Sequence, residues 1–96
     1  MITGHVPSRV VRIDGKVLDP GPSQQIYNHS PDGFAWGYAG SGPAQLALAI
    51  LLHFASREFA LAHYQQFKSE VIAAQPKDDN LSISNNVVHD FIEANR

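Results

Sequence analysis

The stretch from Asn28 to Leu52 reads NHSPDGFAWGYAGSGPAQLALAILL and holds the signals that decide the fold. From residue 44 to about residue 55 the apolar side chains cover every direction of a helix, which is typical of a helix buried on all sides. We place the cap of this helix at Gly42, because Pro43 suits the first helical position. Gln45 then lies where its side chain can reach back to the free N–H of the cap.

The first half of the same stretch carries turn-forming residues and three aromatic rings. Residues 29–33 (HSPDG) predict a turn. Residues 34–38 then predict an aromatic strand, in which Phe34, Trp36 and Tyr38 share one face by the two-residue period of a strand. These rings either cover a helix in the core, which we favour, or form a stacking platform for a base or a peptide proline.

Towards the N-terminus, residues 10–18 (VVRIDGKVL) predict a β-hairpin around Asp14-Gly15. Both central positions of such a tight turn need positive φ, which Asp-Gly provides. Pro20 and Pro22 end the second arm, because proline cannot donate to a strand ladder. We predict a third short extended segment over residues 24–28.

Towards the C-terminus, apolar residues at three- and four-residue steps predict a second helix from about Arg57 to Ala74. Polar residues 75–80 end this helix, and residues 81–83 (LSI) alternate as a brief strand does. Ser84 is expected to cap a last helix over residues 85–94. The apolar stripes of the two helices are Ala60, Tyr64, Phe67 and Val71 in one, and Val87, Val88, Phe91 and Ile92 in the other.

These elements predict an α+β fold in a single domain over residues 1–96. A small antiparallel sheet, made of the N-terminal hairpin and the aromatic strand, packs against three helices. With 44% hydrophobic and 17% charged residues, the chain has the composition of an ordinary globular domain.

Composition also excludes several classes of function. The chain has no cysteine, so disulfides, thiolate zinc sites and cysteine nucleophiles are excluded. The net charge is −2 and no cluster of Lys or Arg occurs, so we expect no nucleic-acid partner. The five histidines lack the paired spacing of metal ligands, and we predict no metal and no cofactor. The longest apolar run, residues 46–52, is far shorter than the roughly 18 to 20 residues that cross a bilayer. The start of the chain lacks a signal-peptide pattern, and we expect a cytoplasmic protein without a membrane partner.

One candidate ligand site lies at the start of the buried helix. Gly40-Ser41-Gly42-Pro43 presents backbone N–H groups where the helix dipole favours an anion. The run lacks the Lys-Ser/Thr pair of a P-loop, and a plain strand-to-helix turn is the alternative that we favour. The tentative ligand-binding set is His29, Trp36, Tyr38, Gly40, Ser41, Gly42 and Gln45.

A catalytic site is not indicated. Ser41, His29 and Asp32 supply the residue types of a hydrolytic triad, but the run around Ser41 is not a G-x-S-x-G nucleophile elbow. We therefore predict no catalytic residues and no enzymatic activity.

The strings HSPDGF, WGY and GSGPAQLALA, within residues 29–49, resemble a family of small proteins of bacteria, phages and plasmids that carries a domain-of-unknown-function label. Residues 66–68 (QFK) and the closing amphipathic helix extend the resemblance over most of the chain. The resemblance implies no established reaction, cofactor or site residues. The family's distribution implies an accessory protein of a mobile element.

The leading hypothesis is a non-enzymatic interaction protein that docks onto another protein, for example as an inhibitor of a host defence or replication factor. The alternative is a small anionic-ligand or nucleotide sensor that uses the turn from Gly40 to Gln45. We also expect a symmetric homodimer, because the all-apolar helix and the Gly/Ala-thin face of residues 34–38 offer more apolar surface than a small domain buries.

Overall fold

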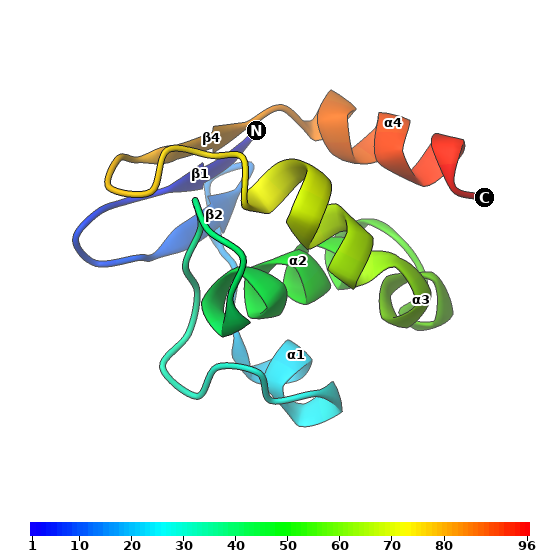
Figure 1. Ribbon diagram of the computed structural model, residues 1–96, viewed down its shortest axis with the longest axis horizontal. Helices are drawn as coiled ribbons and strands as arrows, with labels where there is room; N and C mark the ends of the chain where they lie inside the picture. Colours follow the sequence, from blue (N-terminus) through cyan, green and yellow to red (C-terminus); the bar gives the residue numbers. More distant parts are fainter.

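The computed structural model describes residues 1–96 and confirms an α+β fold, with one antiparallel sheet and four α-helices. The sheet has the strand order β3-β2-β1-β4. It lies towards one end of the long axis, α3 and α4 lie towards the other end, and α2 runs between them (Figure 1). The strands are β1 (Ile2–Gly4), β2 (Val11–Ile13), β3 (Lys16–Val17) and β4 (Leu81–Ile83).

In the chain, α1, α2, α3 and η1 stand between β3 and β4, and α4 follows β4. None of them has the length and apolar character needed to cross a membrane. The helices are α1 (Gly21–Ile26), α2 (Ser41–Phe54), α3 (Arg57–Phe67), the π-helical turn η1 (Lys68–Ile72) and α4 (Asn85–Ala94).

The predicted hairpin is confirmed. Asp14 and Gly15 both have positive φ, 51° and 85°, and the turn joins β2 to β3. The sequence analysis missed β1 (Ile2–Gly4), which ends in glycine, a residue that is depleted in strands. β1 is central in the sheet, since it pairs with both β2 and β4.

One face of the sheet is buried. β1, β2 and β4 each alternate buried, exposed, buried along their three residues. In register, Ile2 lies opposite Ile13 on one side and Ile83 on the other, and all three side chains enter the core. Thr3, between Arg12 and Ser82, faces outward.

The predicted aromatic strand is wrong. Residues 34–38 form no strand, because Gly37 at φ 84° turns the chain and its N–H donates to the carbonyl of Ile72 at 3.0 Å. Phe34 and Trp36 are buried in the core, as expected for core packing, whereas Tyr38 is 40% exposed. The three rings therefore do not share one face.

The predicted extended segment over residues 24–28 is also wrong. Most of it lies in α1, which begins directly after Pro20 and holds Pro22 in its first turn. Proline fits the first turn of a helix because the N–H it lacks would have no helical partner there. The residues that end the strand β3 thus start a helix.

The buried central helix is confirmed, but its start differs from the prediction. α2 begins two residues earlier, with Gly40 as its cap, so that Pro43 lies inside the first turn. All residues from 42 to 51 are buried, and residues 44 and 46–51 belong to the same hydrophobic core as the sheet and the other helices. The side chain of Gln45 does not return to the cap, which corrects that prediction; it points into the protein.

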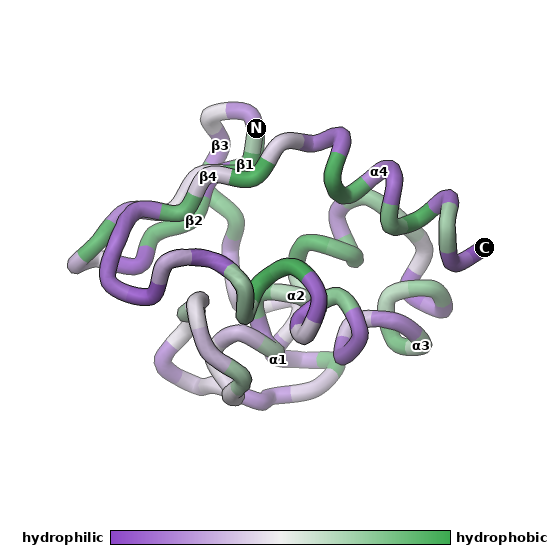
Figure 2. Tube along the Cα trace, turned by 45° about the horizontal axis from the view of Figure 1, so that its top comes forward, coloured by the Kyte–Doolittle hydropathy of each residue, from purple (hydrophilic) through white to green (hydrophobic).

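The C-terminal elements agree with the sequence. The second predicted helix is α3 continued by η1, and Ser84 caps α4 by accepting from the N–H of Asn86 at 3.1 Å. Of the apolar stripe on α4, Val87 is exposed and the other three side chains are buried. Figure 2 shows the matching alternation of hydrophobic and hydrophilic colouring along α4.

Candidate functional site

Gln45 is a fully buried polar side chain in the middle of the apolar helix α2. Its Oε1 accepts from the backbone N–H groups of His29, at 2.8 Å, and Ser30, at 2.9 Å. Its Nε2 donates to Ser23 Oγ at 2.9 Å and to the carbonyl of Tyr27 at 3.1 Å. A side-chain amide has two acceptor and two donor positions, and all of them are used. Gln45 therefore fixes α1 and the segment that follows it onto the central helix.

The segment that Gln45 holds carries an aromatic stack, which we call the Tyr27 platform (Tyr27, His29 and Tyr64). The rings of Tyr27 and His29 are parallel, with centroids 4.1 Å apart and planes 5° apart. His29 Nε2 lies 2.6 Å from the hydroxyl of Tyr64, a buried residue of α3. Tyr27 is 56% exposed, so one face of its ring lies on His29 and the other is open to solvent. The platform is an exposed ring on a rigid support.

The pKa of His29 is lowered, first by desolvation of the half-buried ring and second by the positive charge of Lys68. Lys68 lies one helical turn after Tyr64, and its backbone N–H donates to the carbonyl of Tyr64. A lowered pKa keeps the imidazole neutral near pH 7. The neutral ring has one nitrogen that donates and one that accepts, which suits pairing with a tyrosine hydroxyl.

The lowered pKa of His29 predicts a loss of stability on mild acidification. Because the unfolded chain binds the proton more readily, the free energy of unfolding should fall as the pH drops from about 6.5 towards the folded-state pKa. Above about pH 6.5, the contribution of His29 to the free energy of unfolding should be fully present. NMR titration of the His29 ring, with urea unfolding of wild type and His29→Asn at several pH values, checks this. A ring midpoint at or above about 6.5 would contradict it.

Trp36, expected in the tentative ligand-binding set, lies inside the core. Its Nε1 donates to the carbonyl of Asp79 at 2.9 Å, and the guanidinium of Arg9 lies 4.5 Å from the centre of its ring. Gly4 of β1 adjoins the edge of the ring so closely that a Cβ there would come within 2.6 Å of its Cη2. Trp36 therefore fastens the segment before α2 to the sheet.

The remaining residues of the tentative ligand-binding set fall into two groups. Tyr38 lies against Gly40 and near Gly42, with the ammonium of Lys77 at 5.2 Å from the ring. Ser41 is exposed at the start of α2, while Gly42 is buried against Ala35. The other group is His29 with Gln45. The structure therefore does not gather the set around one point.

Sequence reasoning missed two members of the site. Tyr27 was placed in an extended segment and Lys68 in a helix, with no role for either. Tyr64 was predicted as a core residue, and it is buried. A local signal was available for Tyr27 alone: it stands two residues before His29, a spacing that places two rings on the same side of an extended chain.

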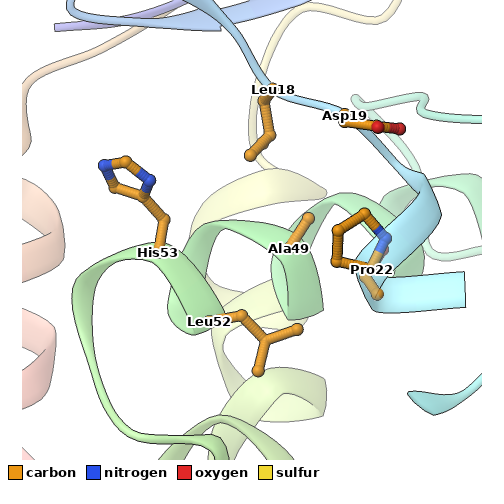
Figure 3. A pocket seen from close by; sticks show the side chains of 7 residues that line it. Leu18, Asp19, Pro22, Ala49, Leu52 and His53 are labelled. Atoms are coloured by element: carbon orange, nitrogen blue, oxygen red, sulfur yellow. The ribbon is translucent and has the colours of Figure 1, made fainter. Parts of the chain in front are cut away.

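The hollows in the surface are small. They range from about 170 to about 310 Å³, at or below the lower end of small-molecule pockets. Figure 3 shows the residues around a hollow of about 230 Å³, with Leu18 from the segment before α1 on one side and Ala49, Leu52 and His53 of α2 on the other. The carboxylate of Asp19 points away from Ala49 and His53 and accepts from the N–H of Gly21 at 2.8 Å. No three His, Asp or Glu side chains stand where they could hold a metal ion.

Comparison with known proteins gives one family match. The model described as "Family of unknown function (DUF6166)" matches residues 3–94, which include the Tyr27 platform, Gln45 and Lys68. No curated protein and no solved structure matches the chain.

Proposed function

The chain belongs to the DUF6166 family of unknown function, and we propose that it acts by binding another protein through the Tyr27 platform, without catalysing a reaction. The observation that carries the proposal is the exposed ring of Tyr27, held in one orientation by stacking on His29. His29 is fixed in turn by Tyr64 and by Gln45. A monomeric domain gains little from so firm a support for a solvent-facing ring.

Tyrosine suits a docking surface for physical reasons. Its ring brings a large contact area with only two side-chain torsions to order, and Tyr is enriched at the centres of protein interfaces. The torsions of Tyr27 are already restricted by the stack, so that binding orders little more. Leu61, 40% exposed, precedes Tyr64 by one turn on α3 and adds apolar surface on the same side of the helix.

The polar groups near the platform favour binding over catalysis. Every hydrogen-bonding position of Gln45 is occupied within the protein, and one ring nitrogen of His29 is held by Tyr64. No hydrogen bond connects His29 with Ser41 or Asp32, the partners that a hydrolytic triad would need. A nucleophile paired with an oriented base is the minimum for such chemistry.

The resemblance supports a finer version of this proposal. In it the chain is an accessory protein of a mobile element, and the bound protein is a host factor of defence or replication that the chain inhibits. Identification of the captured protein tests this version separately from the platform itself.

We expect Tyr27→Ala to abolish capture of the partner in affinity pull-downs from the native host. Truncating a central tyrosine of an interface typically costs 2 kcal/mol or more of binding free energy, about a thirtyfold loss of affinity. Val17→Ser is the matched control, since Val17 is 59% exposed on β3, which belongs to the sheet and not to the platform. It should capture as wild type does.

Equal capture by Tyr27→Ala and wild type would contradict the proposal. Light scattering on the same three proteins tests the homodimer. If wild type is a dimer and Tyr27→Ala is a monomer, the partner is a second copy of the chain. If wild type is a monomer at high micromolar concentration, the partner is another protein.

A further inference from the structure

We propose that the partner docks with an acidic aromatic segment, whose ring stacks on the open face of Tyr27 and whose carboxylate pairs with Lys68. This inference rests on the proposed function and adds the chemistry of the partner. It follows from an unpaired lysine one helical turn after Tyr64, the residue that holds His29 under the exposed ring of Tyr27.

Lys68 is held close to the platform by helix geometry. It lies four residues after Tyr64, with the helical hydrogen bond between them in place, so both side chains leave the same side of the helix. Tyr64 is within 2.6 Å of His29, on which Tyr27 is stacked. Lys68 is half-buried, and its positive charge is close enough to His29 to lower the pKa of that ring.

The charge of Lys68 has no partner within the chain. The two ion pairs join the N-terminal ammonium to Asp14 and Arg96 to Glu93. No hydrogen bond is formed by the Lys68 side chain either, among those of the whole chain. A carboxylate brought to this point would meet a free cation, while a second ammonium would be repelled.

Two other aromatic rings already have a cation. The guanidinium of Arg9 lies over Trp36, and the ammonium of Lys77 lies over Tyr38. The ring of Tyr27 has an imidazole on one face and no partner on the other. Its open face is therefore free for a ring from outside, and stacked aromatic pairs are favourable beyond the area they bury.

A peptide fits this surface better than a nucleic acid does. A single ammonium beside a single open ring matches one carboxylate and one ring. The rest of the chain has no cluster of basic residues, and its net charge of −2 opposes a polyphosphate backbone. A nucleotide remains a measurable competitor in the test below.

The test uses blocked tripeptides as probes and the ring signals of Tyr27 and His29 in NMR titrations. The probes are Glu-Trp-Glu, Lys-Trp-Lys and Glu-Leu-Glu, each acetylated and amidated. We expect Glu-Trp-Glu to bind about three- to tenfold more tightly than Lys-Trp-Lys, because Lys68 forms one exposed ion pair with the acidic peptide and repels the basic one. Glu-Leu-Glu should bind more weakly than Glu-Trp-Glu, because it lacks the ring.

Lys68→Gln should remove the preference for the acidic peptide while the ring signals of Tyr27 still shift. Lys16→Gln, which removes an exposed lysine of β3, should leave the preference unchanged. The inference is overturned if no peptide shifts the Tyr27 signals at millimolar concentration, or if the acidic and basic peptides bind equally. It is also overturned if adenosine monophosphate shifts the same signals at a lower concentration than Glu-Trp-Glu.

The failures of the two proposals are distinguishable. If Tyr27→Ala loses the captured protein but Lys68→Gln still captures it as well as wild type does, the proposed function stands and the acidic segment is overturned. Conversely, if the chain prefers Glu-Trp-Glu but Tyr27→Ala captures the protein as wild type does, the binding chemistry stands and the docking role of the Tyr27 platform is overturned.

Discussion

Gln45→Leu is expected to lower the free energy of unfolding by about 3 to 5 kcal/mol, from about 1 to 3 kcal/mol for the backbone N–H left without a partner and about 0.5 to 1.5 kcal/mol for each of the other hydrogen bonds lost. Leucine matches glutamine in size and suits the apolar surroundings of α2, so packing changes little. The N–H of Ser30 loses its only partner, while the N–H of His29 and the carbonyl of Tyr27 lose the Gln45 amide and keep the 3.1 Å bond between them. For a domain stable by about 5 to 15 kcal/mol, this is a large fraction.

Urea unfolding followed by circular dichroism measures this loss, with Gln66→Leu as the matched control. Gln66 is exposed, and its amide donates only to Asn95, at 3.1 Å. Its replacement should change the free energy of unfolding by no more than about 0.5 kcal/mol. If the two leucine variants were equally stable, Gln45 would not be what holds the segment after α1.

The same substitution connects the fold to the candidate site. The backbone of Tyr27 and His29 is oriented by Gln45, and the parallel stack depends on that orientation. Under conditions in which the Gln45→Leu variant is still folded, we therefore expect the ring signals of His29 to be broadened or shifted relative to wild type. Gln66→Leu should leave those signals as in wild type.

Elements whose conformation is decided by near neighbours were predictable from the sequence. Asp14-Gly15 accepts positive φ at both turn positions whatever surrounds it, and Ser84 caps α4 through an N–H two residues away. The apolar run of α2 likewise admits only a buried helix. In each case the signal and the structure it produces lie within a few residues of each other.

The segment between α1 and α2 was not predictable, because distant residues decide its path. Phe-Ala-Trp-Gly-Tyr has the alternation of a strand, yet Gly37 bonds to Ile72, and Trp36 bonds to Asp79 across 43 residues. The contact between His29 and Tyr64 spans 35 residues. The sequence identifies His29 and Gln45 as members of a ligand-binding set, Gln45 within an anion-binding turn, and not as the support of an exposed ring.

Gly37→Ala is expected to destabilise the fold much more than Gly15→Ala, although both glycines have nearly the same φ, 84° and 85°. An alanine at positive φ costs about 1 to 2 kcal/mol at either position. At Gly15 the added Cβ meets nothing within 4 Å, so the cost ends there. At Gly37 the Cβ would lie 2.6 Å from the backbone nitrogen of Lys77 and closer still to its Cα, in a contact between two main chains.

Relief of that contact requires the segment around Gly37 to move away from residues 72–77. The movement would break the bond from Gly37 to Ile72 and strain the bond from the buried Trp36 to Asp79. We therefore expect Gly37→Ala to lose about 3 to 5 kcal/mol in total, combining the φ cost with lost hydrogen bonds and core packing. Urea midpoints of the two variants measure the difference. Equal midpoints would mean that the two segments can part freely, and that φ alone requires glycine at position 37.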